Sequence, residues 1–305
     1  MLGEFDHHSA FWRRLAYLGA RHGPSAWVRH SPAFFGAAFA LALPGARRQV
    51  RENLRWVRGP VGRVREQREV LRTFVDYAQC LAESLGAERP EAAASALTVV
   101  GEQHLALALA RGRGAVIVTG HVGPWDAAAR LLCRAVDADV VIAMVGEPDL
   151  AARSLHDGVR ARSGVRVVHV GAHPLDALPL LSHLRRGGLV AVQLDRGAPS
   201  GRVLEVELFG RSFAVPEGPF RLASIAGAPI VPVFARRRGY FAYELVIEAP
   251  LELPRRASEE ALLTAAASAA RSLEAFIRTA PTQWFQFQPP RAPSDPGAAA
   301  RARPR

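Results

Sequence analysis

A histidine and an aspartate with four residues between them are the strongest candidates for chemistry in this sequence. His121 and Asp126 lie in the stretch AVIVTGHVGPWDA, which reads as a buried strand over 115–118, a turn, and a helix that begins at Gly123-Pro124, because proline is favoured at the first helical position. One bend of the chain could therefore bring the carboxylate to the imidazole. A carboxylate on one ring nitrogen fixes the tautomer and leaves the other nitrogen free to accept a proton.

The same two residues also fit a structural interpretation. An acid in the first turn of a helix is stabilised by the helix dipole alone, and a histidine can simply be a turn residue. The position of the turn favours chemistry, because ligands of open α/β sheets bind beyond the carboxyl ends of the strands.

Further charged residues follow other predicted strands. Asp195 and Arg196 come directly after the apolar run 189–194, where site residues of such sheets are found. Glu205 and Glu207 alternate with apolar residues and share one face of a strand, so they either lie in solvent or approach His121 and tune it. Arg160 and Arg162 end a predicted helix, where arginine is favourable with or without a function.

A second Gly-Pro pair opens another helix in the stretch AVPEGPFR. The amino ends of the helices at Gly123 and Gly218 could point into one cleft and hold a phosphate or a developing oxyanion there, with Arg221 adding a cation. Alternatively, Glu217 and Arg221 form an ordinary i,i+4 salt bridge on a solvated face.

Strands and helices alternate from about residue 97, which predicts an α/β fold with a mostly parallel central sheet covered by helices. Residues 9–86 are predicted to be helical, with breaks at Gly23-Pro24, Pro44-Gly45 and Gly59-Pro60. We expect a helical, membrane-facing layer over 1–90, an α/β core over 91–289 and a disordered tail over 290–305. The predicted strands are 97–100, 115–118, 138–144, 165–170, 189–194, 203–208, 230–235 and 240–247, with helices near 102–111, 124–136, 148–162, 174–186, 217–226 and 258–279.

Composition points to an anionic partner. The formal net charge is +11 and every basic residue is arginine, which suits a membrane surface or a phosphorylated substrate. The amino end does not resemble a signal peptide, and the apolar run 33–43 is too short to span a bilayer. Phe34, Phe35 and Phe39 with flanking arginines fit a helix lying in an anionic membrane interface, or equally a helix packed on the core.

The sequence lacks the motifs that are typical of several enzyme classes. The sequence has no G-x-S-x-G elbow, Walker A lysine, G-x-G-x-x-G or H-E-x-x-H, and its two cysteines, Cys80 and Cys133, are predicted to be free thiols. We therefore expect no metal and no bound cofactor. Nucleic acid is not an expected partner, because no aromatic and basic platform is evident.

The ordered set of motifs resembles the membrane-associated acyltransferases of the lipid A late acyltransferase superfamily, to which the phosphatidylinositol mannoside acyltransferases also belong. Asp126, where many lipid A enzymes have glutamate, and the closing segment Trp284-Phe-Gln-Phe287 favour the mannoside branch. The resemblance rests on His121-Val-Gly-Pro-Trp-Asp126, Asp195-Arg196, Glu205-Val-Glu-Leu-Phe-Gly210, Pro216-Glu-Gly-Pro219, Gly227-Ala-Pro-Ile-Val-Pro232, Arg48-x4-Asn53-Leu54 and Pro281-Thr-Gln-Trp284.

The resemblance implies roles for individual residues. His121 would be the general base, Asp126 its orienting acid and Glu205 a further acid near the histidine. Arg160 would be the central arginine of the family, with Arg162 as the alternative. The expected substrate-binding residues are Gly123, Trp125, Arg160, Arg162, Asp195, Arg196, Glu217, Gly218 and Arg221.

The implied activity is transfer of a fatty acyl chain from acyl-CoA or acyl-carrier protein to a hydroxyl of a glycolipid or lysophospholipid, without an acyl-enzyme. The apolar amino-terminal layer would receive the chain, and the protein would be peripheral or monotopic on the cytoplasmic face of a bacterial inner membrane. The alternatives are a non-catalytic lipid-binding protein and an acyl-thioester hydrolase that uses the same His–Asp pair on water.

Overall fold

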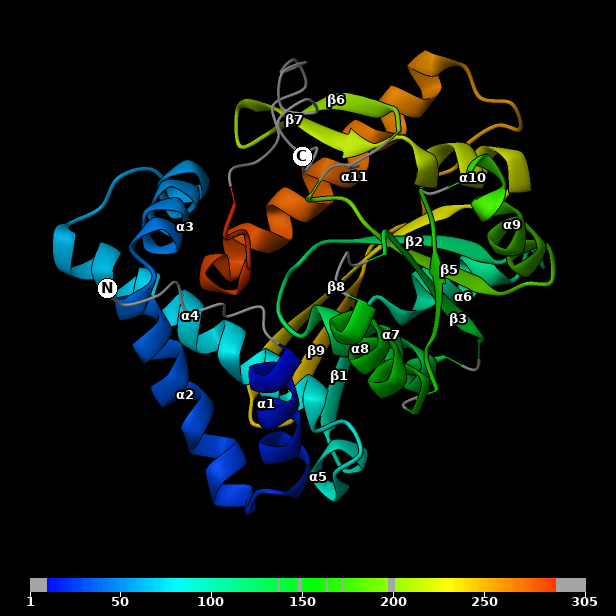
Figure 1. The fold of residues 1–305 in the computed structure, drawn as a ribbon. Coiled ribbons are helices and arrows are strands. Elements are labelled where there is room, and N and C mark those ends of the chain that lie inside the picture. The colour runs from blue at the N-terminus through cyan, green and yellow to red at the C-terminus, as the bar shows by residue number, and fades with distance from the viewer. Residues whose placement is uncertain are drawn as a thin grey trace, which may run out of the picture.

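The structure is a computed structural model that describes residues 10–136, 138–146, 150–162, 164–171, 173–196 and 201–288. The predicted disordered tail, 290–305, lies outside these residues. The predicted fold class is confirmed, since a mostly parallel sheet lies at the centre with helices around it (Figure 1).

The central sheet has seven strands in the order β1-β9-β8-β2-β5-β3-β4. Every pair is parallel except β8 with β9, as the sequence suggested for the last strands. Because β2 is central and buried up to its last residue, Thr119, its run of β-branched residues is explained by cover on both faces. The strands are β1 (Ala96–Val100), β2 (Ala115–Thr119), β3 (Val140–Met144), β4 (Arg166–His169), β5 (Leu189–Gln193), β8 (Ile230–Gly239) and β9 (Ala242–Ile247).

Helices cover both faces of the sheet. One core packs the sheet against α9, α10 and α11, and the other packs it against α6 and α7. The helix α8 contacts β4 at the edge of the sheet. The bounds are α6 (Glu102–Leu109), α7 (Trp125–Ala135), α8 (Leu150–Arg162), η1 (Pro174–Ala177), α9 (Leu178–Arg185), α10 (Gly218–Ala226), α11 (Glu259–Thr279) and η2 (Pro281–Gln283).

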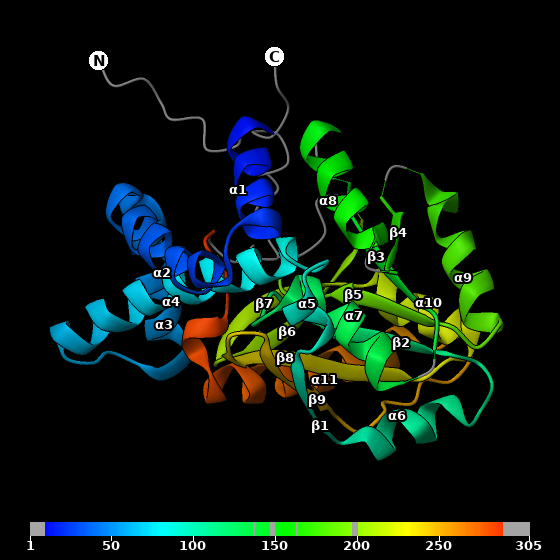
Figure 2. The ribbon, with the colours of Figure 1, turned by 90° about the horizontal axis from the view of Figure 1, so that it is seen from below.

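The amino-terminal helices form a layer beside the sheet (Figure 2). They are α1 (Ala10–His22), α2 (Ser25–Ala42), α3 (Pro44–Arg58), α4 (Arg63–Leu85) and the short α5 (Pro90–Ala93), so the three predicted breaks are confirmed. Helix α2 packs on α4, and the two backbones approach closely at Gly36, since a Cβ there would lie 2.7 Å from the Phe74 carbonyl oxygen.

A small hairpin, which the sequence did not fully predict, lies apart from the main sheet. Strand β6 (Val203–Leu208) was expected, but β7 (Arg211–Pro216) was not. Phe209 and Gly210 join them with φ angles of 50° and 73°, the positive values that a two-residue hairpin loop requires. The Phe209 N–H donates to Glu274 on α11 at 2.6 Å.

Candidate active site

Two adjacent strands bring the central pair of the site together. Thr119 ends β2 and Gln193 ends β5, and these two residues are partners in the parallel register. His121 and Asp195 each follow two residues later, so they reach the same height above the carboxyl edge of the sheet. The sheet thus positions a histidine beside an aspartate that is 74 residues away in the sequence.

The His121 ring is held by Asp195. Its Nδ1 lies 2.7 Å from Asp195 Oδ1, and the His121 backbone N–H donates to both carboxylate oxygens at 3.0 and 2.9 Å. Both residues are buried. The carboxylate fixes the tautomer with the proton on Nδ1, and Nε2 is then the ring nitrogen that can accept a proton.

The electrostatics of the pair favour a neutral histidine beside an ionised aspartate. Burial lowers the pKa of His121, although the Asp195 charge opposes that shift. Burial acts to raise the pKa of Asp195, but the charge of His121 and the hydrogen bonds from it outweigh this effect, and the pKa is about 2. At neutral pH this arrangement is that of a general base with its orienting acid.

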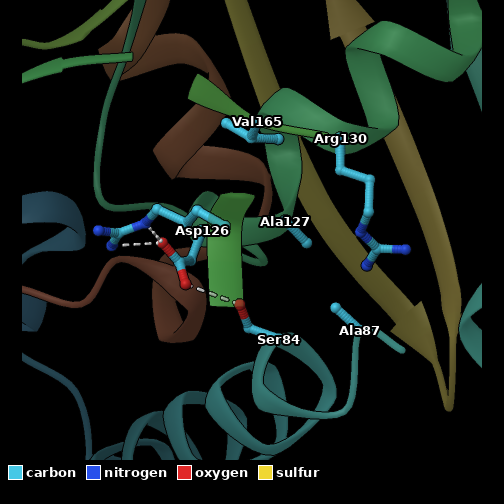
Figure 3. A pocket seen from close by; sticks show the side chains of 7 residues that line it. Ser84, Ala87, Asp126, Ala127, Arg130 and Val165 are labelled. Carbon is cyan, nitrogen blue, oxygen red and sulfur yellow. Dashed lines mark hydrogen bonds and ion pairs between the residues drawn. The ribbon is translucent and has the colours of Figure 1, made fainter. Parts of the chain in front are cut away.

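Asp126 has a different environment from the one that the sequence predicted. Its carboxylate accepts from Arg160 Nε at 2.8 Å and from Ser84 Oγ at 2.8 Å, and Figure 3 shows it directed toward Ser84 on α4. The predicted hydrogen bond between Asp126 and the imidazole is thus corrected, because the ring Nδ1 bonds to Asp195 while Arg160 and Ser84 bond to Asp126. The charge of Asp126 still acts to raise the pKa of His121. Asp126 joins the start of α7 to α4 and α8.

The structure separates the two arginines that the sequence left as alternatives. Arg160 bonds to Asp126 and also lies 3.5 Å from the Met144 sulfur at the end of β3. Arg162 instead contacts Glu88 at 2.5 Å and the Tyr17 hydroxyl at 2.9 Å. Arg160 therefore lies beside Asp126 at the carboxyl edge of the sheet, whereas Arg162 links α8 to the amino-terminal helices.

The turn after His121 requires its glycine. Gly123 has a φ of 50°, and a Cβ there would lie 2.3 Å from the Ala235 carbonyl oxygen on β8. Trp125, two residues later, stacks on Tyr77 of α4 at a centroid distance of 5.5 Å. Its ring centroid lies 6.3 Å from that of His121, so Trp125 forms an aromatic wall beside the imidazole.

An apolar cavity lies next to this wall. It has a volume of about 550 Å³, including space open to solvent, and extends between α7 and the sheet. Thr119 and Gln193 contribute polar groups where β2 and β5 end, and Trp125, Asp126 and Arg160 also line it. The apolar lining includes Ile117, Ala128, Ala129, Leu132, Ile142, Met144, Ala191, Val192 and Val233.

A smaller cavity lies on the other side of Asp126, between α4, α7 and α8. Its volume is about 230 Å³, and its lining includes Ser84, Asp126, Arg130 and Arg160. The Arg130 side chain extends from α7 toward Ala87 (Figure 3). Asp126 and Arg160, which are joined by an ion pair, thus line both cavities.

Two further predicted site residues, Arg196 and Glu205, lie in different parts of the structure. Arg196 lies beside the central pair, where its charge acts to lower the pKa of both His121 and Asp195. Glu205 is exposed on the hairpin and accepts from Ser212 at 2.5 Å, so the solvated alternative holds and the structure does not bring Glu205 to the histidine.

The i,i+4 salt bridge predicted at the second Gly-Pro turn is present, but Glu217 is buried and does not lie on a solvated face. Besides the ion pair with Arg221, Glu217 forms one with Arg202. Neither of the two cavities beside Asp126 is lined by Glu217, Gly218 or Arg221. The expected shared cleft between the two helix amino ends is therefore not formed by these cavities.

Several residues of the site gave no signal in the sequence. In the sequence, Ser84 and Tyr77 resemble ordinary positions of an amphipathic helix. Trp284 was identified only as part of a closing motif, although its indole N–H donates to Asp195 Oδ2 at 3.0 Å.

Within the described residues, no group of three or more His, Cys, Asp or Glu side chains is placed to hold a metal ion.

Comparisons with known proteins identify the family of this chain. The sequence model of the family described as bacterial lipid A biosynthesis acyltransferase matches residues 5–290. Two curated relatives, both named phosphatidylinositol mannoside acyltransferase, come from Mycobacterium tuberculosis strains H37Rv and CDC 1551. They are 31% and 30% identical over 133 residues, which are 43% of this chain and 42% of each relative.

The alignment to the curated relatives thus spans less than half of their length, whereas the family match extends over nearly all of the chain. The match includes both strands that carry the central pair, together with the closing segment around Trp284. This chain belongs to the bacterial lipid A biosynthesis acyltransferase family.

Proposed function

We propose that this protein transfers a fatty acyl chain from an acyl thioester to a hydroxyl group of a glycolipid or lysophospholipid at a membrane surface. The observation that carries the proposal is the buried His121–Asp195 pair, which provides a general base in a chain of this family. The relatives named for phosphatidylinositol mannoside favour a glycolipid acceptor.

The His121–Asp195 pair is suited to transfer of the acyl group directly to the acceptor, without an acyl-enzyme. His121 Nε2 takes the proton from the acceptor hydroxyl, and the resulting oxygen nucleophile attacks the thioester carbonyl. When the tetrahedral intermediate collapses, the carbon–sulfur bond breaks and the proton passes from His121 to the leaving thiolate. Asp195 stabilises the imidazolium between these steps, so Asp195 takes the role that the family resemblance implied for Asp126.

The apolar cavity under α7 supports a place for an acyl chain. It is bounded by Trp125, which lies next to His121, and its floor is the apolar surface of the central strands. Burying a methylene group in such a site is worth about 0.8 kcal/mol. We therefore propose that the part of the chain next to the thioester contacts this apolar lining.

Arginines near the pair support binding of an anionic donor. Arg196 is exposed at the carboxyl end of β5, and Arg160 lines both cavities with its charge offset by Asp126. Arginine binds phosphate groups in a bidentate manner, so either residue could contact the phosphates that acyl-CoA and acyl-carrier protein both carry.

An exposed apolar face supports peripheral attachment. One face of α2 is buried against the protein and consists of Val28, Pro32, Gly36 and Ala40. The aromatic side chains of α2 lie on its exposed face. This arrangement, with exposed Arg29 and Arg48 nearby, fits an anionic membrane interface. The exposed apolar residues are Trp27, Phe34, Phe35, Phe39 and Leu41. Within the part of the chain that the structure describes, no helix could cross a bilayer.

The test is an assay of purified protein with radiolabelled acyl-CoA or acyl-carrier protein and vesicles that contain a mannosylated phosphatidylinositol, a lipid A precursor or a lysophospholipid. We expect a labelled acceptor to form, and His121→Ala to abolish its formation while the melting temperature changes little. Release of free fatty acid in the absence of an acceptor would indicate a thioesterase. Transfer that persists in His121→Ala would overturn the assignment of the base.

A further inference from the structure

The segment after η2 touches both halves of the central pair. On the His121 side, Trp284 forms an antiparallel bridge with Val122, and the Phe285 N–H donates to the His121 carbonyl oxygen at 2.9 Å. The Gly123 N–H donates to the Gln283 carbonyl oxygen at 2.8 Å. Backbone hydrogen bonds thus fix the turn that carries the histidine.

The same segment also holds Asp195. The Trp284 indole N–H donates to Asp195 Oδ2 at 3.0 Å, and the Gln286 side-chain amide donates to the Asp195 carbonyl oxygen at 2.8 Å. Asn53 of α3 anchors the segment in turn, because its amide donates to the Gln286 carbonyl oxygen at 2.6 Å.

From these contacts we infer that Trp284 is a positioning residue, which holds the Asp195 carboxylate in the orientation that directs His121. The two carboxylate oxygens differ in their side-chain partners, since Oδ1 meets the imidazole Nδ1 and Oδ2 meets the indole, while the His121 backbone N–H donates to both. Without the indole, only groups of His121 would bond to the carboxylate oxygens, so the carboxylate would have more freedom to rotate. The inference rests on the proposed function, in which His121 is the base.

The indole has an electrostatic effect as well as a geometric one. A hydrogen bond donated to an ionised carboxylate withdraws part of its negative charge and is stronger than a bond between neutral groups. Because the Asp195 charge raises the pKa of His121, removing the indole donor should strengthen this effect. The pKa of His121 should then rise from its lowered value.

Trp56 offers a matched control in the same aromatic cluster. Its ring centroid lies 6.0 Å from that of Trp284, and both rings contact Phe209. Among the described residues its indole nitrogen has no hydrogen-bond partner. Trp56→Phe therefore changes similar packing without removing a donor from Asp195.

The experiment compares Trp284→Phe with Trp56→Phe by steady-state kinetics over pH and by NMR titration of the His121 ring. We expect Trp284→Phe to lower kcat about tenfold, the size of effect of one charge-assisted hydrogen bond, with KM little changed. The acidic limb of kcat and the NMR pKa of His121 should both move to higher pH. Trp56→Phe should leave both pKa readings in place.

A second variant separates the donor from the shape of the ring. Replacing Trp284 with benzothienylalanine, in which sulfur takes the place of the N–H, keeps the bicyclic shape and serves if Trp284→Phe does not fold. Unchanged kcat and His121 pKa in that variant, or equal effects of Trp284→Phe and Trp56→Phe, would overturn the inference. The NMR readout needs no activity, so it is independent of whether His121→Ala abolishes transfer.

Discussion

At the scale of single residues, the site depends on which carboxylate meets the imidazole. The sequence predicted Asp126 as the partner, with Glu205 as a further acid near the histidine, and identified Asp195 only as a substrate-binding residue. In the structure Asp126 is bound by Arg160 and Ser84, while Asp195 accepts from the His121 ring and backbone. Proximity in sequence was therefore a poorer guide than the carboxyl ends of neighbouring strands.

This difference predicts unequal effects of two isosteric substitutions. Asp195→Asn places an amide where the Nδ1 proton must be accepted, which favours the wrong tautomer, so we expect kcat to fall by about 10²-fold or more. Asp126→Asn keeps an oxygen that can accept from Arg160 and should lower kcat by about tenfold or less. Kinetics of both variants, with melting temperatures as a folding control, test the assignment. A larger kcat loss in Asp126→Asn would contradict it.

At the scale of secondary structure, the sequence was most informative where periodicity was strong. The breaks in the amino-terminal helices and the apolar run of β2 were predicted, but the adjacency of β2 and β5 was not. These strands are neighbours although β3 and β4 intervene in the chain. The register Thr119 with Gln193 is a tertiary property, which explains why Asp195 was identified as a site residue without its partner.

The β6–β7 hairpin was missed for a local reason. A two-residue hairpin loop with positive φ angles usually contains Asn-Gly or Asp-Gly, whereas this one contains Phe209-Gly210. The strained phenylalanine is supported by tertiary contacts, since Glu274 accepts its N–H and Arg278 lies over its ring at 5.1 Å. A prediction from the residue types in the loop cannot include these tertiary contacts.

The hairpin loop yields a stability prediction with an internal control. Gly210 and Gly45 both have open space where a Cβ would be, but only Gly210 has a positive φ, 73°. Gly210→Ala should destabilise the protein by about 1–2 kcal/mol, the cost of a left-handed conformation. Gly45→Ala, in the first turn of α3, should leave stability unchanged or slightly higher. Urea unfolding measures both, and equal effects would show that the backbone conformation is not the cause.

At the scale of the whole molecule, the charge and the exposed apolar face point to the same partner. The chain has a net charge of +11, and α2 presents an edge-to-face cluster in which the Phe35 ring meets those of Trp27 and Phe34. The sequence left open whether these rings pack on the core, and the structure places them on the surface. A basic protein with exposed aromatic rings is suited to an anionic bilayer.

This arrangement predicts the residues that control membrane binding. Phe34→Ser with Phe35→Ser should weaken binding to phosphatidylglycerol vesicles by about tenfold or more, because two aromatic side chains lose their apolar contact with the bilayer. The matched control is Leu107→Ser on α6, an exposed apolar residue on a helix that lies far from α2 in both views (Figures 1 and 2). Vesicle co-sedimentation measures both.

Salt separates the two contributions to that binding. Raising the ionic strength should weaken the association of the native protein, since the attraction between arginines and anionic lipid is screened, and the aromatic contribution should persist at high salt. When salt is added, the vesicle binding of the double variant should therefore fall by a larger fraction than that of the native protein. If Leu107→Ser weakened vesicle binding as much as the double variant, or if the double variant bound normally, α2 would not be the face that meets the membrane.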